Sequence, residues 1–344
     1  MSDEAPEVLK PLKTFSHLAK ERRRPSEYEI TTTKAYWLMD SLAPGNDFQG
    51  ERQTKEPFEI SSEIPMAKWY HKYRDESPLQ YENWEAYRDP DETIYRTYCR
   101  MQDGQETYVD GILDEFSETE HDVDLDPKWV KVLASLYTPA RYPLHALQMG
   151  AAYIAQIAGS STIANSAMFQ TADQFRWVSR VAYRTAELAK THPDAGFGKN
   201  ERKHWEEDAP WQGFRELLEK ALTAYDMGES FTALNLVAKP AFDEAFFRQF
   251  GASARRNNDM LVHFLADAAL RDSERCRRWS TAFVELALKN KANQKVFQGW
   301  IDKWVPLADK AIEDFCKALP DLPDGAKEAK KAAQAFRAGL GFSG

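Results

Sequence analysis

Apolar side chains recur every three or four residues along most of the chain, which is the spacing of one face of an α-helix. The clearest stretch, FQTADQFRWVSRVAYRTAELAK, lies in a helix predicted from about Thr162 to Thr191, ahead of Pro193. Other long helices are predicted within residues 93–116, 146–159, 258–289 and 296–319, and convincing strand patterns are absent. The chain is therefore predicted to be all-α, a bundle of helices about 20 to 30 residues long.

The periodicity divides the chain into three parts. Residues 1–85 lack it and are rich in proline, glycine and polar residues, so they are predicted to form an extended N-terminal arm. Residues 86–322 form the predicted helical domain, and residues 323–344 form a peripheral tail with few apolar anchors. The aromatic side chains of the arm cannot be buried within it, so they dock either on the chain's own core or on a partner.

Composition narrows the range of functions. The 344 residues carry a net charge of −9, so no broad positive field is available for binding nucleic acid. Three widely spaced cysteines without a CxxC pair argue against a disulfide framework and favour a reducing cytoplasm. The N-terminus lacks a signal-peptide pattern, and the most apolar stretch, ALQMGAAYIAQIAG, is too short to span a bilayer.

Two of the predicted helices share a signature. Gln174-Phe-Arg-Trp177 and Cys276-Arg-Arg-Trp279 both read X-x-Arg-Trp, and they lie 276 − 174 = 102 residues apart, which suggests an internal duplication. In ferritin-like di-iron proteins, two core helices carry Glu-x-x-His and two others carry one Glu each. At the positions that would correspond to these ligands, this chain has, in chain order, Leu144 or His145, then Gln174 and Trp177, then Lys239, then Cys276 and Trp279.

These side chains are poor metal ligands. A neutral amide binds metals weakly, an indole has no free lone pair, and an ammonium group stands where a bridging carboxylate belongs. Iron binding at this place is therefore not expected. The two tryptophans would instead fill the space that a metal and a substrate need.

Several segments resemble the β-subunits of soluble di-iron multicomponent monooxygenases of the toluene, phenol and alkene type: TFSHLAKERRRPSEYEI, RDPDETIYRTY, DGQETYV, YTPARYPLHALQM and WQGFRELLEKAL. In the catalytic α-subunits of that family the signature reads Glu-x-Arg-His, and this chain keeps the Arg while both metal-binding residues are replaced. The resemblance covers most of residues 10–320 and implies a ferritin-like bundle without a metal of its own. It also implies that the following residues occupy degenerate metal-site positions: Gln174, Trp177, Lys239, Cys276 and Trp279.

The resemblance also implies that the chain belongs to a multisubunit complex. The chain would be the non-catalytic β-subunit of an NADH-dependent oxygenase, an (αβγ)2 hydroxylase, and would hold no cofactor. The α-subunit would carry a di-iron site and use O2 to hydroxylate or epoxidise an arene or alkene. Electrons would come from NADH through a reductase with FAD and iron–sulfur groups and through a Rieske ferredoxin, and an effector protein would act on the complex. The arm is then predicted to contact partner subunits through Arg22, Arg23, Arg24, Tyr28, Trp37 and Trp69.

Two other interpretations are open. Glu118-Thr-Glu-His121 and Glu201-Arg-Lys-His204 match Glu-x-x-His literally, which would suit a stand-alone metalloenzyme. Neither motif lies on an apolar helix that faces a core, and chance matches are expected in a chain with many Glu residues and seven His. The other alternative is a free-standing binding protein with an apolar pocket between its long helices.

Overall fold

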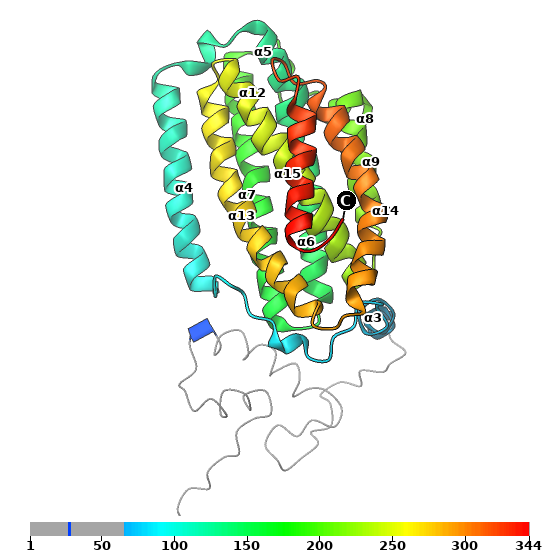
Figure 1. The fold of residues 1–344 in the computed structure, drawn as a ribbon. Helices are drawn as coiled ribbons and strands as arrows, with labels where there is room; N and C mark the ends of the chain where they lie inside the picture. The colour runs from blue at the N-terminus through cyan, green and yellow to red at the C-terminus, as the bar shows by residue number, and fades with distance from the viewer. Residues whose placement is uncertain (1–26, 29–64, 344) are drawn as a thin grey trace, which may run out of the picture.

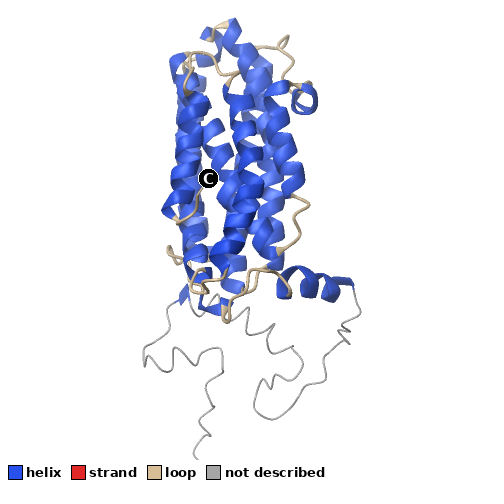
Figure 2. Cartoon of the chain, turned by 45° about the vertical axis from the view of Figure 1, so that its right-hand side comes forward, coloured by secondary structure: helices blue, strands red, loops and turns tan. Residues whose placement is uncertain are grey.

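The computed structural model describes residues 27–28 and 65–343, and all regular structure within these ranges is helical (Figures 1 and 2). The all-α prediction is confirmed. None of these helices is both long and apolar enough to cross a membrane. The predicted arm residues Arg22, Arg23, Arg24 and Trp37 lie outside the described residues.

The helices follow one another in this order: α3 (Pro65–Tyr70), η2 (His71–Asp75), η3 (Trp84–Ala86), α4 (Tyr95–Glu118), η4 (His121–Asp124), α5 (Pro127–Val132), η5 (Leu133–Tyr137), η6 (Thr138–Ala140), α6 (Arg141–Ile157), α7 (Ser161–Thr191), α8 (Glu201–Glu207), α9 (Ala209–Ala221), α10 (Met227–Phe231), η7 (Thr232–Ala238), α11 (Lys239–Phe242), η8 (Asp243–Phe250), α12 (Gly251–Arg256), α13 (Met260–Ala287), α14 (Asn293–Cys316) and α15 (Gly325–Gly339). The long helices lie side by side as a bundle (Figure 1).

Local sequence sets the ends of the two central helices. The Ser160 hydroxyl accepts the backbone N–H of Ile163 and caps the start of α7, and α7 ends two residues before Pro193. Asp259 caps α13 in the same way, accepting the backbone N–H of Val262 over 3.0 Å. The predicted boundaries of both helices therefore agree with the structure to within two residues.

One continuous helical rod runs from Met227 to Arg256 through α10, η7, α11, η8 and α12. Its η7 and η8 stretches are π-helical, which widens the helix by about one residue per turn. Pro240 lies between these stretches, where it lacks an N–H to donate. The rod brings Asn235 and Lys239 to face α13.

Aromatic side chains build the core beside this rod. Phe242, Phe246 and Phe250 stack along it, with ring centroids 5.1 Å and 5.5 Å apart. Phe315 of α14 and Phe214 of α9 close over them. Such rings bury a large apolar area and account for much of the core's stability.

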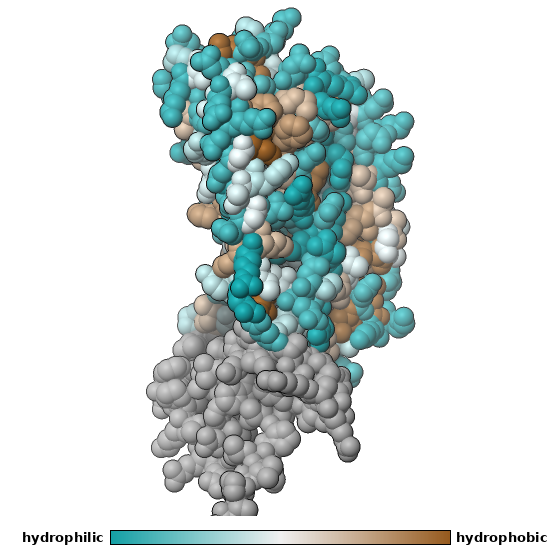
Figure 3. Space-filling view, turned by 90° about the vertical axis from the view of Figure 1, so that its left-hand side faces the viewer, coloured by the Kyte–Doolittle hydropathy of each residue, from teal (hydrophilic) through white to brown (hydrophobic). Residues whose placement is uncertain are grey.

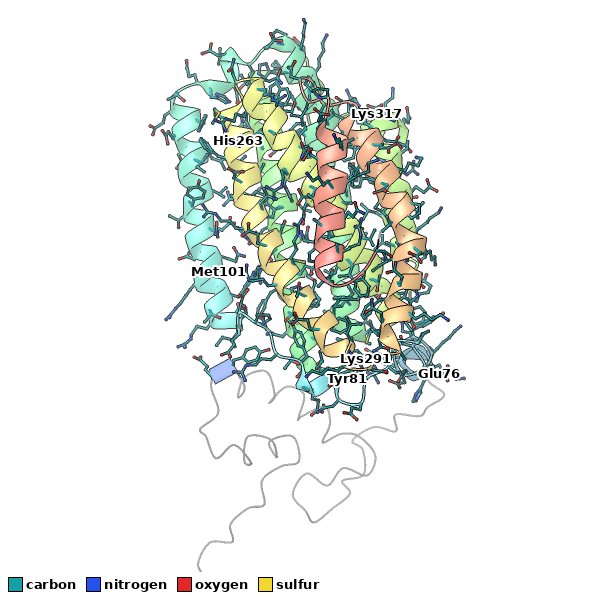
Figure 4. The ribbon with its side chains drawn as sticks, in the orientation of Figure 1. Glu76, Tyr81, Met101, His263, Lys291 and Lys317 are labelled. Carbon is teal, nitrogen blue, oxygen red and sulfur yellow. The ribbon has the colours of Figure 1, made fainter. Side chains whose placement is uncertain are left out.

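The segment before α4 wraps one end of the bundle, where Figure 4 shows Glu76, Tyr81 and Lys291. Trp84 stacks on Phe283 of α13 at 5.3 Å, and Gln80 accepts hydrogen bonds from Asn290 and Asn293. At the other terminus, α15 lies against η8 and α14. Its buried side chains are those of Ala329, Ala333 and Arg337.

Close approach between α9 and α14 depends on a glycine. A Cβ added to Gly213 would lie 2.5 Å from the Cα of Ala311, so the helices would have to separate. Gly104 in the middle of α4 has open space instead. We expect Gly213→Ala to lower the free energy of unfolding by about 1 to 3 kcal/mol. We expect Gly104→Ala to raise it by about 0.5 to 1 kcal/mol, because alanine is the better helix former.

Denaturant unfolding of both variants, followed by circular dichroism, measures the two effects. Equal stabilisation by the two substitutions would contradict the close α9–α14 contact.

Candidate functional site

The two helices that share the X-x-Arg-Trp signature, α7 and α13, pack together in antiparallel directions. The indole Nε1 of Trp177 donates to Asp272 of α13 over 2.9 Å. Trp279 makes the reciprocal bond, donating to Gln170 of α7 over 3.0 Å. Because 272 − 170 and 279 − 177 both equal 102, the two bonds are equivalent under the predicted internal repeat.

An ion pair joins Asp173 to Arg275 midway between these two bonds. The two residues are also 102 apart, so a two-fold relation between the helices maps the pair onto itself with the charges exchanged. The contacts therefore follow the symmetry of the sequence signature. They support the predicted duplication, although the chemical identities at the equivalent positions have diverged.

Asp173 is fully enclosed and receives several hydrogen bonds. Tyr98 and Gln102 of α4 donate to it over 2.9 and 2.7 Å. Burial is the main cause that raises the pKa of Asp173 to about 7, the neighbouring Asp272 carboxylate adds to it, and Arg275 opposes it. This carboxyl group is therefore held by partners from two other helices, α4 and α13.

Asp272 has its own set of donors. Arg176 donates to it over 3.0 Å and also pairs with Glu106 of α4, while Gln102 donates over 3.1 Å. Together with Trp177, these groups bring three donors to one carboxylate. The acidic part of the site is thus neutralised by arginines and does not require a cation.

Gln170 is the centre of the uncharged part. Its carbonyl oxygen accepts from the Cys276 thiol and the Trp279 indole, each over 3.0 Å. Its amide group donates to Asn235 of the rod over 3.0 Å, and Asn235 in turn donates to Ser280 over 3.1 Å. One amide therefore links α7, α13 and the rod.

Lys239 lies buried at the next turn of the rod. Its Nζ is 2.8 Å from both carboxylate oxygens of Asp243 and 3.2 Å from the Ser273 hydroxyl. The ammonium group is therefore satisfied within the chain.

Cys276 is an interior side chain rather than a reactive thiol. Burial raises its pKa to about 11, so the thiol stays protonated at neutral pH. The adjacent arginines do not activate it, because each pairs elsewhere. Arg275 pairs with Asp173, Arg277 with Glu244 and Arg278 with Asp91.

The remaining positions at which the sequence predicts degenerate metal ligands lie on α7 and α6, and they take no part in the hydrogen-bond network described above. Gln174 is buried on the inner face of α7, but Gln170, one turn earlier, makes the bridging contacts. On α6 the inward-facing position is apolar, because Leu144 is fully buried there and His145 is exposed. The signal that identifies Gln170 and Asp272 is a polar residue on an otherwise apolar helix face, seven residues before each tryptophan.

These residues do not fit a di-iron centre. Where such a centre needs converging carboxylates and imidazoles, the site offers an amide, two indoles and a paired ammonium. Within residues 27–28 and 65–343, no three His, Cys, Asp or Glu side chains gather in a way that could hold a metal ion.

The two literal Glu-x-x-His motifs lie apart from this site, and their members bind other partners. His121 is 3.2 Å from the buried carboxylate of Asp259, while Glu118 is exposed at the end of α4. His204 bonds Asp208 over 2.6 Å, and Glu201 is buried and accepts the backbone N–H of Gly198. Neither motif forms a two-ligand site.

Two of the predicted arm contacts are visible and lie on the chain itself. Tyr28 is buried and accepts the backbone N–H of Asp89 over 3.0 Å, and burial raises its pKa to about 12. Trp69 donates to the Tyr153 hydroxyl of α6 over 3.0 Å and packs against Tyr225.

Comparison with known proteins identifies the family of the chain. Residues 69–291 match the model of the methane/phenol/alkene hydroxylase family. The chain is 47% identical over 313 residues to the hydroxylase component subunit beta of the toluene-4-monooxygenase system of Ectopseudomonas mendocina, covering 91% of this chain and 92% of that one. It is 25% identical to a phenol 2-monooxygenase oxygenase component of Acinetobacter pittii, over 73% of this chain and 76% of that one.

Two solved structures of hydroxylases also align with this chain. A chain of toluene 4-monooxygenase with toluene bound in the resting active site aligns with a TM-score of 0.82 and 47% identity, covering 91% of this chain and 99% of that one. A chain of the xenon-pressurised phenol hydroxylase of Pseudomonas sp. OX1 aligns with a TM-score of 0.77 at 18% identity, over 99% of both chains, and shares the fold.

The hydrogen bonds to Asp272 can be tested by removing the carboxylate. Asp272→Leu leaves the Trp177 indole without its partner and deprives Arg176 of one of two carboxylates. We expect a loss of about 3 to 5 kcal/mol in the free energy of unfolding, measured with denaturant, because buried donors are left unpaired. Asp267→Leu, an exposed position on the same helix, is the control and should change stability by less than about 1 kcal/mol. Similar losses in both variants would argue against the network.

Proposed function

The chain belongs to the methane/phenol/alkene hydroxylase family, and we propose that it is the non-catalytic β-subunit of a toluene-type monooxygenase hydroxylase. The observation that carries the proposal is the site itself. At the centre of the ferritin-like bundle, where a catalytic subunit needs metal ligands, Gln170, Trp177 and Trp279 bond to protein groups. The 47% identity to a relative named as subunit beta supports the same role.

The function of the chain is then to support the subunit that carries the reaction. The complex hydroxylates or epoxidises an aromatic or alkene hydrocarbon with O2 and electrons from NADH. We propose that the α-subunit holds a di-iron site and that the hydroxylase is an (αβγ)2 assembly. A reductase with FAD and iron–sulfur groups, a Rieske ferredoxin and an effector protein complete the proposed system.

The unpaired cysteines support a cytoplasmic location for this assembly, because Cys99, Cys276 and Cys316 are all free. We also retain the proposal that residues 1–85 contact partner subunits. Since Tyr28 and Trp69 already pack on their own chain, this role would fall more heavily on other residues of the arm.

A free-standing protein that binds an apolar ligand has less support. The apolar cavity between α6, α9 and the rod, lined by Ala146, Leu218 and Leu234, measures about 20 Å³, which suits a single water molecule. A larger cavity of about 270 Å³ lies near the C-terminal end of α7. It is lined by charged groups such as Asp122, Arg184 and Glu187. A hydrocarbon would gain little from that lining.

Iron content tests the proposed role. We expect the purified chain to contain no stoichiometric iron by elemental analysis and to oxidise no toluene. Co-expression with the catalytic subunit should yield a complex that contains iron. Stoichiometric iron and hydroxylase activity in the monodisperse chain alone would overturn the proposal.

A second measurement addresses the stand-alone metalloenzyme. If Glu118/His121 or Glu201/His204 held a metal, the double variant His121→Ala/His204→Ala would abolish metal content and activity. We expect the hydroxylase complex built with this variant to keep its iron. Its stability should fall by about 1 to 3 kcal/mol, because the buried Asp259 loses the His121 partner.

A further inference from the structure

Helix α4 lies at the edge of the bundle and is only shallowly buried (Figure 1). Four of its 24 residues are buried, and two of these, Tyr98 and Gln102, carry polar groups. Helix α13, by comparison, buries 16 of its 28 residues. Figure 3 views the molecule from the α4 side, where the described surface is mainly hydrophilic. Because α4 buries little apolar area, its attachment to the bundle depends strongly on polar contacts.

The two buried polar groups of α4 meet at one carboxyl group. The Tyr98 hydroxyl and the Gln102 amide nitrogen both donate to Oδ1 of Asp173 on α7, over 2.9 and 2.7 Å. The same nitrogen of Gln102 also donates to Asp272 on α13, over 3.1 Å. One amide group of α4 therefore connects both central helices. Since both carboxyl groups accept from one nitrogen atom, they are close neighbours.

Two buried carboxylates at this distance repel each other, and one proton relieves the repulsion. Asp173 is the more enclosed of the two, because its side chain is 3% exposed and that of Asp272 is 9% exposed. The carbonyl oxygen of Gln102 is also buried and has no hydrogen-bond partner among the described residues. A proton on Asp173 removes one negative charge from the cluster and provides a donor beside that oxygen. The geometry therefore favours a protonated Asp173.

The charged and titratable groups that face Asp173 come from three helices: Tyr98 and Glu106 from α4, Arg176 from α7, and Asp272 and Arg275 from α13. The two arginines favour the ionised form of Asp173, whereas burial and the Asp272 carboxylate oppose it. Burial is the largest of these effects and raises the pKa of Asp173 to about 7. Asp173 therefore gains or loses its proton close to neutral pH.

We propose that Asp173 is a proton switch for the docking of α4, which is held most firmly when Asp173 is protonated. Tyr98 and Gln102 cover the carboxyl group, so water reaches it when they leave with α4. Water stabilises a carboxylate better than the enclosed site does. Ionisation of Asp173 therefore favours the detached state of α4. The switch is a property of this chain and does not rest on its proposed role in a hydroxylase.

The direction of the pH dependence follows from this difference in burial. The pKa of Asp173 is raised while α4 is docked and falls toward the ordinary value of 3.8 when α4 detaches. The added stability of the docked state is complete below pH 3.8 and is lost as the pH rises through about 7. Between these limits, each pH unit makes detachment up to about tenfold more frequent.

Hydrogen exchange of the full-length chain, followed by mass spectrometry, tests the switch. The exchange of residues 95–108 is measured at a pH of about 5 and of about 8 and is corrected for the intrinsic effect of pH on exchange. We expect the opening equilibrium of this segment to increase at least about tenfold at the higher pH. The amides of α14, which lies away from Asp173, are the internal control and should show no such increase.

Two variants separate ionisation from simple loss of a contact. Asp173→Asn keeps an acceptor for Tyr98 but cannot ionise, so the pH dependence of α4 opening should fall to less than about twofold. Glu106→Gln, at a less buried acid of the same cluster, should raise opening at both pH values and keep the pH dependence. A pH dependence that persists in Asp173→Asn, or that is absent from the wild type, overturns the proposal.

Tyr98→Phe decides the question if Asp173→Asn does not fold. Phenylalanine keeps the ring that stacks on Phe169 at 4.6 Å but removes the hydroxyl that stabilises the ionised Asp173. We therefore expect the midpoint of the pH dependence of α4 opening to move to higher pH. A midpoint that does not move would show that another group titrates, and would overturn the assignment to Asp173.

Discussion

Burial requires the polar groups at the centre of this bundle to find partners within the protein, and this constraint organises the α7–α13 contact. Among the groups of this network, only Gln102 Oε1 and Arg275 Nε lack a hydrogen-bond partner. Trp177 bonds to Asp272 and Trp279 bonds to Gln170, so each helix provides both a donor and an acceptor for the other. An unpaired buried donor or acceptor costs about 1 to 3 kcal/mol. A shift of either helix by one turn would separate both bonds and the Asp173–Arg275 pair together, so the network fixes the register of the two helices.

The same constraint explains why the centre is closed to a metal. In a di-iron protein, buried carboxylates are neutralised by two cations. Here Asp173 and Asp272 are neutralised by Arg275 and Arg176, and Lys239 is neutralised by Asp243. Protein cations occupy the electrostatic role of the metal, and indole rings fill the volume. Reintroducing one ligand would leave an unpaired charge, because each group is already matched.

The fold was largely predictable from sequence, and the site was predictable in part. Helix ends follow local rules, as Ser160 and Pro193 show for α7. The shared signature, repeated after 102 residues, lies on two helices that pack together, α7 and α13. It did not identify Gln170 as the bridging residue, because a hydrogen-bond partner across two antiparallel helices depends on their register. The contact between Asn235 and Gln170 could not be predicted either, because the π-helical stretches of the rod change which residues face inward.

The docking of the N-terminal arm could not be predicted, for a different reason. Its aromatic residues had to dock somewhere, and the sequence allowed either the chain's own core or a partner. Tyr28 and Trp69 lie on the chain itself, and each does so through a bond to a group far away in sequence, the backbone N–H of Asp89 and the hydroxyl of Tyr153. Such long-range pairing leaves no local pattern. The periodic helices were predictable because their signal is local, and the docking of the arm was not.

A filled centre also changes what the surface can do. A catalytic bundle must admit substrate and O2, whereas this centre is packed and most of its polar groups are hydrogen-bonded. A close-packed interior is rigid, and a rigid helix can present a fixed row of side chains to a neighbour. The inner face, with Gln170, Asp173 and Trp177, fixes the position of the helix within the bundle.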